Sequence, residues 1–450
     1  MTYPETLAYL DSFINYEKIA DYPYNESLKL ERINNFLDIV GNPQDTLKSI
    51  HIAGTKGKGS TCAFISYILR EAGYKTGLYT SPHLLSFRER IRILKPYRQG
   101  EERTAEGDFE GAIPEEDLIR LVDYLRPKIE KYNSNSQSGP LSFFEAYTAL
   151  AFVYFKEQRV DFTVLETGLG GRLDATNTVD SLVCAITPIS YEHTQKLGNT
   201  LREIASEKAG IIKDSQGQFV IVAPQEEEAR LVIRGRCQEF GAKLYEVGRD
   251  ICYQGTEAGF SLEGISSLYQ DLKIKLTGQH QLANAALAVG VIEALGFHGI
   301  KINRQEIKRG LYKTIWPGRC EIISRNPLVI LDGAQNISSS IALREAIRTR
   351  FQYKRLFLVL GISNDKDIKG VSKELHSLAD GVILTRADNP RATPPQDLAE
   401  YFSGKPVYLT ANIKEARTKA CALAKGDDLV LVCGSLFVVG EFRDEATRSR

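Results

Sequence analysis

A glycine-rich turn between an apolar run and a helix-forming run constrains the fold of this chain more than any other feature. The apolar run covers residues 49–53, and the turn reads Gly-Thr-Lys-Gly-Lys-Gly-Ser-Thr over residues 54–61; a helix-forming spacing follows it. Glycines let the backbone approach an anion closely, and the N–H groups at a helix start point toward it. The sequence therefore predicts a phosphate-binding loop, in which Lys58 supplies a mobile positive charge and Ser60 or Thr61 a hydroxyl.

The spacing of this turn differs from the strict phosphate-loop pattern. Only two residues separate Gly54 from Gly57, and Gly59 lies between Lys58 and Ser60. A glycine-rich strand-to-helix turn that binds nothing has the same local features. The turn alone leaves both interpretations open.

Length and charge narrow the class of protein. A chain of 450 residues is too long for one hydrophobic core, so two domains are expected. Lysine plus arginine and aspartate plus glutamate both number 57, and this balance excludes nucleic acid or a membrane surface as the main partner. Seven scattered cysteines without a Cys-x-x-Cys pair, and the absence of a leader-like N-terminus or a membrane-length apolar run, predict a cytoplasmic protein with free thiols.

Alternating strands and helices predict an N-terminal P-loop ATPase-like domain, residues 1–315, with a mostly parallel sheet. An alternating pattern with three glycines over residues 250–276 adds a small antiparallel sheet. The stretches 95–114 and 131–140 are expected to be loops because they are rich in polar residues and glycine. The other expected strands are residues 76–79, 161–165, 182–186 and 219–222, and the expected helices are residues 27–40, 115–129, 143–155 and 281–295.

The same rhythm restarts after the Trp-Pro-Gly sequence at residues 316–318. It predicts a C-terminal Rossmann-like α/β domain, residues 316–450, without the Gly-x-Gly-x-x-Gly turn of a dinucleotide site. The expected strands are residues 328–331, 356–360, 382–384, 407–409 and 429–432.

Polar side chains follow several strands of the predicted N-terminal sheet. Ser81, Glu166 and His193 each lie just after a predicted strand, where ligands of parallel sheets gather. A carboxylate beside a glycine-rich turn suits a Mg²⁺ ion near phosphates. Each residue also has a structural alternative: Glu166 as a strand-end cap, His193 as a structural histidine, and Lys208 as an ordinary helix-surface lysine.

Taken together in order, these segments closely resemble the folylpolyglutamate synthase/dihydrofolate synthase family, a branch of the muramyl-peptide ligase superfamily. The resemblance covers essentially the whole chain. It is carried by residues 54–60, 80–84, 166–177, His193, 197–201, 207–213, 278–285, 316–319 and 332–334.

The resemblance implies roles for particular residues. ATP binding is implied for Gly54, Thr55, Gly57, Lys58, Gly59, Ser60, Thr61, Asn284, Arg319 and Asp332, the last two from the C-terminal domain. The implied Mg²⁺ ligands are Ser81, Glu166, His193 and Lys208, with two ions, the second held through a carbamylated Lys208. The implied substrate-binding residues are Ser81, Leu173, Asp174, Ala175, Gln335 and Ser435; Leu173, Asp174 and Ala175 lie on the pterin side, and Ser435 lies on the glutamate side. Lys58, Glu166, His193 and Lys208 are the implied catalytic residues.

Two positions depart from the family pattern. Gln335 stands where the family usually has histidine after Asp-Gly-Ala, so a charged role is lost there although hydrogen bonding is kept. Glu192 stands where the family has aspartate before the metal histidine.

The function implied by the resemblance is ATP-dependent amide formation through an acyl phosphate. L-glutamate would be joined to a folate or to dihydropteroate by a monomeric cytoplasmic enzyme. The rival interpretations are a muramyl-type amino-acid ligase of the same superfamily and a nucleotide-binding switch that makes no product. The sequence does not separate dihydrofolate synthase from folylpolyglutamate synthase activity.

Overall fold

The computed structural model describes residues 1–19, 22–96, 109–213 and 217–448. The chain forms two compact units. Unit 1 comprises Met1–His83, Phe87–Lys275 and Gln281–Thr314, and unit 2 comprises Leu84–Ser86, Leu276–His280 and Ile315–Arg450. Among the helices of the described ranges, none combines the length and apolar character needed to cross a bilayer.

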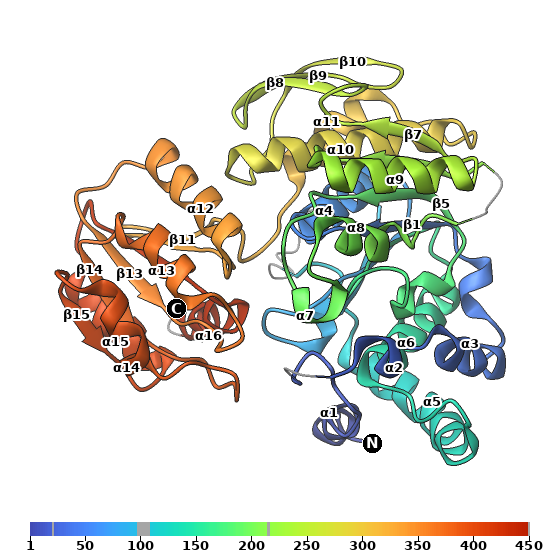
Figure 1. Ribbon diagram of the computed structural model, residues 1–450, viewed down its shortest axis with the longest axis horizontal. Helices are drawn as coiled ribbons and strands as arrows, with labels where there is room; N and C mark the ends of the chain where they lie inside the picture. Colours follow the sequence, from blue (N-terminus) through green and yellow to red (C-terminus); the bar gives the residue numbers. More distant parts are fainter. Residues whose placement is uncertain (20–21, 97–108, 214–216, 449–450) are drawn as a thin grey trace. The chain divides into compact units, whose positions relative to one another are not determined.

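Unit 1 is coloured from blue through green to yellow in Figure 1. It is built on a seven-stranded sheet with the order β3-β2-β4-β1-β5-β6-β7, in which only β3 runs antiparallel to its neighbour. Its strands are β1 (Ser49–Ala53), β2 (Thr76–Tyr79), β3 (Ile91–Leu94), β4 (Phe162–Glu166), β5 (Ser181–Ile186), β6 (Phe219–Val222) and β7 (Lys243–Glu246). Every residue of β1, β2, β4 and β6 is buried, as expected for a parallel sheet covered by helices on both faces.

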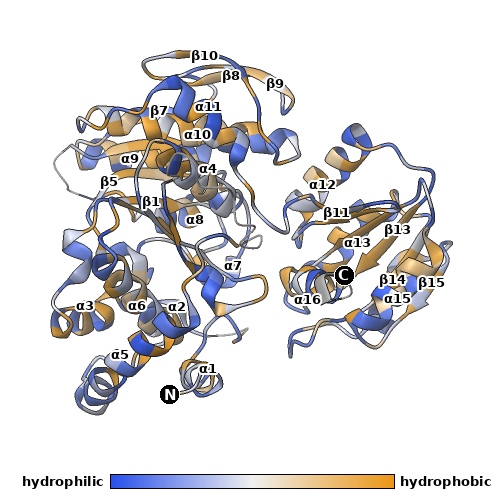
Figure 2. Cartoon of the chain, turned by 180° about the vertical axis from the view of Figure 1, so that it is seen from behind, coloured by the Kyte–Doolittle hydropathy of each residue, from blue (hydrophilic) through white to orange (hydrophobic). Residues whose placement is uncertain are grey.

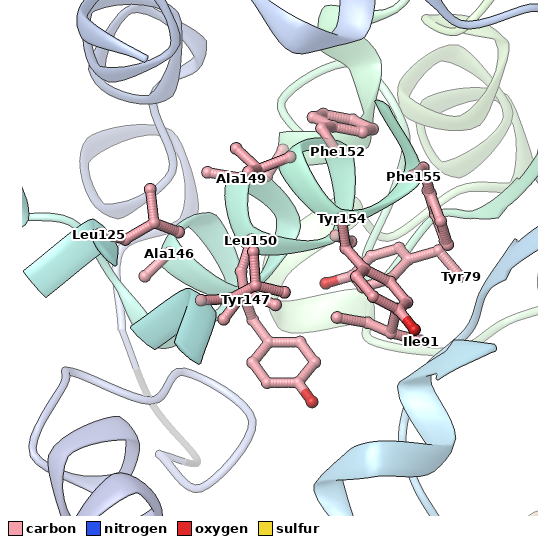
Figure 3. Packing of buried hydrophobic residues seen from close by; sticks show 14 of the residues in the cluster. Tyr79, Ile91, Leu125, Ala146, Tyr147, Ala149, Leu150, Phe152, Tyr154 and Phe155 are labelled. Carbon is pink, nitrogen blue, oxygen red and sulfur yellow. The ribbon is translucent and has the colours of Figure 1, made fainter. Parts of the chain in front are cut away.

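Helices enclose this sheet. They are α1 (Tyr3–Asp11), α2 (Tyr24–Ser27), α3 (Leu30–Ile39), α4 (Lys58–Glu71), α5 (Glu115–Asn135), α6 (Phe143–Glu157), α7 (Thr194–Leu197), α8 (Leu201–Ala209), α9 (Glu227–Glu239), α10 (Gln279–Gly296) and α11 (Arg304–Lys313), with short 3₁₀ turns η1 (Pro43–Thr46), η2 (Phe87–Arg90) and η3 (Ala175–Thr178). The helix α6 is mostly apolar and buried, and Figure 3 shows its Phe155 beside Tyr79 and its Ala146 beside Leu125.

The three strands that precede α10 in the chain form a small antiparallel sheet, as the alternating pattern predicts. It consists of β8 (Cys252–Thr256), β9 (Gly259–Glu263) and β10 (Leu268–Leu272). Glu293 of α10 fastens it, because the Glu293 carboxylate accepts hydrogen bonds from the Tyr269 hydroxyl at 2.9 Å and the Ser266 hydroxyl at 3.1 Å.

Unit 2 is a second α/β structure with the strand order β11-β12-β16-β13-β14-β15, and only β11 is antiparallel to its neighbour. Its strands appear as apolar ribbons in Figure 2, and apolar clusters cover both of their faces. The strands are β11 (Glu321–Arg325), β12 (Leu328–Leu331), β13 (Leu356–Leu360), β14 (Gly381–Leu384), β15 (Val407–Leu409) and β16 (Leu429–Cys433), and the helices are α12 (Ile337–Arg350), α13 (Ile368–His376), α14 (Pro395–Leu398), α15 (Ile413–Leu423) and α16 (Leu436–Arg448), with the 3₁₀ turn η4 (Ala399–Phe402).

Half of the loop expected at residues 131–140 is helical. Residues 131–135 continue α5, because Tyr132 stays on its buried face and donates its hydroxyl to the Arg32 carbonyl at 2.9 Å. The polar residues that suggested a loop bond to their own helix instead: Ser134 donates to the Glu130 carbonyl and Asn135 to the Lys131 carbonyl, each at 2.8 Å.

The expected loop at residues 95–114 lies partly outside the described residues, which exclude 97–108. Its end packs against β3 rather than facing solvent, since Ile113 is fully buried and donates its N–H to the Ile91 carbonyl at 2.8 Å. Likewise, the Leu84–Ser86 segment belongs to unit 2, where Leu84 packs against one of the two apolar clusters.

Candidate functional site

The glycine turn after β1 has a backbone that other residues would disturb. Gly54 has a φ of +140° and Gly57, the N-cap of α4, a φ of +89°. A Cβ atom at Gly54 would collide with the Thr187 side chain, and one at Gly57 with the Asn284 amide oxygen. Gly57 provides no side-chain cap to α4, so the first-turn N–H groups form the kind of helix start that binds anions.

Lys58, Glu166 and Ser81 come together beside this turn. The Lys58 Nζ lies 3.9 Å from the Glu166 Oε1, and the Ser81 backbone N–H donates to the Glu166 Oε2 at 3.2 Å. These residues follow or end the adjacent strands β1, β2 and β4, whose carboxyl ends meet at one edge of the sheet. At 3.9 Å the Lys58 ammonium group is not hydrogen-bonded to the Glu166 carboxylate, so it can bind a phosphate instead.

Lys208 is buried in the same region, and its interpretation as a surface lysine is wrong. Its Nζ donates to the Gly54 carbonyl at 2.8 Å, and the residue is only 5% exposed. Burial lowers the pKa of Lys208 to about 7; Lys58 and Lys56 act in the same direction, and Glu192 opposes them. Near neutral pH a large share of this amine is therefore uncharged and nucleophilic.

The turn after β4 holds the end of α8 that carries Lys208. Arg172 donates its backbone N–H to the Glu207 carbonyl at 2.8 Å and its Nε to the Glu207 carboxylate at 3.0 Å. The Tyr24 hydroxyl donates to the other Glu207 oxygen at 3.0 Å. A Cβ atom at Gly171 would press on the carbonyls of Glu207 and Lys208, which explains a glycine there.

His193 occupies a different setting. It is exposed, and it has a left-handed backbone with a φ of +52° at the N-cap of α7. Within the described ranges, no group of three or more His, Cys, Asp and Glu side chains could hold a metal ion. The predicted set has only Glu166 and His193 of those types, beside Ser81 and Lys208, so it stays a prediction.

Asp174, a predicted substrate-binding residue, holds its own turn. Its buried carboxylate accepts four hydrogen bonds, from the N–H groups of Gly168, Leu169 and Thr176 at 2.8, 2.9 and 3.0 Å, and from the Thr176 hydroxyl at 2.6 Å. Burial raises the pKa of Asp174, and these hydrogen bonds oppose the rise. Because four hydrogen bonds fill the acceptor sites of a carboxylate, a substrate contact would have to share them. Neighbouring Leu173 is half-buried and Ala175 buried.

The same turn reaches a histidine inside the sheet. Thr176 donates its hydroxyl to Asp174, so it accepts from the His51 Nε2 at 2.8 Å, while the His51 Nδ1 has no hydrogen-bond partner among the described residues. Burial lowers the pKa of His51 from 6.5 to about 3. His51 is therefore a neutral structural side chain at physiological pH.

This histidine predicts a loss of stability in acid. Below pH 6.5 the unfolded chain takes up a proton at His51 that the folded chain excludes until about pH 3. The free energy of unfolding should therefore fall by about 1.4 kcal/mol for each pH unit over this range. We expect His51→Gln to remove this contribution, so that urea unfolding at pH 7 and pH 5 shows the variant losing about 2 kcal/mol less than the wild type. An identical loss in both proteins would contradict the burial of a neutral imidazole.

The predicted residues of unit 2 gather at the carboxyl ends of β12 and β16. Asp332 is buried and accepts from the N–H groups of Cys320 and Ala334, both at 2.8 Å; burial raises the pKa of Asp332 against the nearby charge of Arg319. The Gln335 N–H donates to the Ser339 hydroxyl at 3.2 Å. The buried Ser435 hydroxyl accepts from the Phe437 N–H at 3.2 Å at the start of α16.

Within each unit the structure brings several of the predicted residues together. In unit 1 it brings together the glycine turn, Lys58, Ser81, Glu166, Lys208 and Asn284, and in unit 2 Arg319, Asp332, Gln335 and Ser435. Sequence reasoning missed Thr187, which fits against Gly54, and Tyr24, which supports Glu207. Glu207 lies inside a motif carried by the resemblance, which was the one available signal; Thr187 and Tyr24 had none.

Comparisons with known proteins find ligase domains in this chain and relatives that match more than nine tenths of its length. Residues 132–292 match the Mur ligase middle domain, and residues 318–436 match the Mur ligase glutamate ligase domain. The dihydrofolate synthase/folylpolyglutamate synthase of Bacillus subtilis is 36% identical over 427 residues, covering 92% of this chain and 94% of the relative. The folylpolyglutamate synthase of Lacticaseibacillus casei is 30% identical over 453 residues, covering 98% of each.

Solved structures give the same picture. Mycobacterium tuberculosis folylpolyglutamate synthase complexed with ADP superimposes with a TM-score of 0.87 at 29% identity, covering 99% of this chain and 98% of that one. Escherichia coli FolC in complex with DHPP and ADP gives a TM-score of 0.84 at 30% identity, covering 100% and 99%.

Proposed function

Because this chain belongs to the folylpolyglutamate synthase/dihydrofolate synthase family of ATP-dependent ligases, we propose that it joins L-glutamate to the carboxylate of a folate or of dihydropteroate. The observation that carries the proposal is the cluster around the glycine turn, where Lys58 faces Glu166 and Lys208 bonds to Gly54. ATP is the nucleotide, in keeping with neighbours solved with ADP.

The chemistry proceeds in two steps. A carboxylate oxygen of the substrate forms a bond to the γ-phosphorus of ATP while the bond from that phosphorus to the bridging oxygen breaks, which gives an acyl phosphate and ADP. The glutamate nitrogen then forms a bond to the acyl carbon, phosphate leaves, and the nitrogen loses a proton. Lys58 neutralises charge on the transferring phosphoryl group, and the glycine turn and the start of α4 bind the phosphates.

Glu166 fits a Mg²⁺ ion beside those phosphates. Its carboxylate is a hard oxygen ligand that accepts a hydrogen bond from the Ser81 N–H at 3.2 Å, and the Lys58 Nζ lies 3.9 Å from it. Bound Mg²⁺ would supply charge neutralisation on the phosphate oxygens. We assign Ser81, Glu166 and His193 to this ion.

We further propose a second Mg²⁺ ion that is held through a carbamylated Lys208. A neutral amine forms a bond to the carbon of CO₂ and loses one proton, which converts the lysine into a carboxylate ligand. The low pKa of Lys208, about 7, supports this modification because the reactive neutral form is populated. The change would also add a negative charge near Lys56 and Lys58.

The remaining assignments rest on the family. We propose that residues 1–315 bind ATP, Mg²⁺ and the folate, with Asn284 against the glycine turn. Residues 316–450 contribute Arg319 and Asp332 to ATP binding, Gln335 to substrate binding and Ser435 to glutamate binding. We propose a monomer in the cytoplasm; the seven free cysteines, five of them buried, are compatible with a reducing compartment.

One experiment tests the proposed function. Enzyme, ATP, Mg²⁺ and glutamate are mixed with dihydropteroate or with tetrahydrofolate, and products are identified by mass spectrometry. A product heavier by one glutamate residue, formed with equal amounts of ADP and phosphate, is expected with at least one acceptor. ATP hydrolysis at the same rate with and without glutamate and acceptor, and no new product, would instead support a switch. In a third reaction a muramyl precursor replaces the folate, and a product formed only there would support the other ligase.

A further inference from the structure

The two lysines of the glycine turn have different partners. The Lys56 Nζ lies 2.6 Å from the Glu192 Oε1, whereas the Lys58 Nζ lies 3.9 Å from the Glu166 Oε1. The Lys56 and Glu192 side chains are 29% and 15% exposed, so the pair is partly withdrawn from water. Lys56 is therefore held by the Glu192 side chain, and Lys58 is the lysine that can contact a bound ligand.

Glu192 belongs to a segment that is fastened to the glycine turn at successive points. The N–H groups of Thr55 and Lys56 donate to the Pro188 carbonyl at 3.0 and 3.3 Å. The Thr55 hydroxyl accepts from the Ser190 N–H at 3.1 Å and donates to the Ser190 carbonyl at 3.3 Å. The Lys56–Glu192 pair continues this series one residue before His193.

His193 directly follows Glu192, and its carbonyl accepts hydrogen bonds from the N–H groups of Lys196 and Leu197, both at 2.9 Å. It is exposed, it begins the four-residue helix α7, and its φ of +52° is one that non-glycine residues adopt rarely and at an energetic cost. A carboxylate fixed on the preceding residue limits where the His193 backbone can lie.

We propose that Lys56 is a positioning residue: its ion pair with Glu192 holds the 192–193 peptide against the glycine turn and thereby sets the place of the His193 imidazole as a metal ligand. The inference rests on the proposed function, in which His193 binds the metal. The competing role for Lys56 is direct contact with the phosphates. The two roles differ in what Glu192 does, because only a positioning role requires it.

The test measures metal and nucleotide binding separately. Mn²⁺ binding in the presence of ADP is followed by electron paramagnetic resonance, and ADP binding without metal by calorimetry. Lys56→Met and Glu192→Gln should each weaken Mn²⁺ binding by about 10-fold, as for other partners that orient metal ligands, while metal-free ADP binding stays within about twofold. The exchanged pair, K56E with E192K, should recover Mn²⁺ binding to within about threefold of the wild type.

The control is Arg126→Met, which removes an exposed ion pair to Glu130 of similar length, 2.7 Å, on α5 and should change neither measurement. A direct phosphate role for Lys56 would show as weakened metal-free ADP binding in Lys56→Met, normal Mn²⁺ binding in Glu192→Gln, and no recovery in the exchanged pair; this result would overturn the inference. Synthesis is not the readout, so failure of the folate assay alone leaves the result interpretable. Absence of Mn²⁺ binding to the unchanged protein with ADP would overturn both proposals.

Discussion

Lys58→Ala is expected to lower the rate of amide synthesis by about 10³-fold, the scale measured when a single charged group is removed from a phosphoryl or oxyanion site. Lys58 lies at the start of α4, its side chain is 17% exposed, and its Nζ lies 3.9 Å from the Glu166 Oε1. Its charge is thus available to the transferring phosphoryl group, and its loss should change the free energy of unfolding by less than about 1 kcal/mol. The measurement is the rate of ADP release dependent on glutamate, together with thermal melting.

The matched control for this prediction is Lys131→Ala, which removes an exposed lysine of α5 and should leave the rate of synthesis unchanged. The rate should fall in Lys58→Ala even at saturating ATP, because the interaction strengthens in the transition state. A variant that kept full synthesis with normal ADP affinity would remove the glycine turn from the ATP site.

The central strands could be predicted because they are buried on both faces and form continuous apolar runs. Residues 219–222 and 356–360 are examples, and both lie inside their sheets as predicted. The edge strands β7 and β11 were not predicted, since Lys-Leu-Tyr-Glu and Glu-Ile-Ile-Ser-Arg mix polar and apolar residues as half-exposed segments do. Their pairing depends on long-range neighbours that a local pattern does not contain.

Some features of the candidate site could likewise be predicted from the local sequence, and others could not. The glycine turn and Glu166 could be predicted because the local sequence itself has the features of a phosphate loop and a strand end. The burial of Lys208 could not, since residues 201–209 have an ordinary amphipathic pattern and only packing against Gly54 shows that this lysine faces inward. The Lys56–Glu192 pair joins residues 136 positions apart, beyond any local signal.

Lys208→Met is the second large effect. We expect it to lower synthesis by about 10²-fold or more, the scale of a lost metal ligand or partner. Methionine fills a similar volume but removes the donor to the Gly54 carbonyl, so the free energy of unfolding should fall by about 1–3 kcal/mol while the fold is kept. The direct measurement is carbon-13 NMR with labelled bicarbonate: the wild type should show a carbamate carbon bound to the protein, and Lys208→Met should lack it.

Lys208→Arg separates the two possible roles of this side chain. In the wild type the Lys208 Nζ lies 2.8 Å from the Gly54 carbonyl oxygen. Arginine keeps a positive charge and a donor for this carbonyl, but it cannot form the carbamate. If Lys208 acts as a carboxylate after carbamylation, Lys208→Arg should be as inactive as Lys208→Met, and wild-type enzyme depleted of CO₂ should regain its rate when bicarbonate is added. If Lys208 only braces the glycine turn as a donor, arginine should restore synthesis and bicarbonate should have no effect. The second pattern, or a wild type without a carbamate signal, would exclude the second metal ligand that we assign to Lys208.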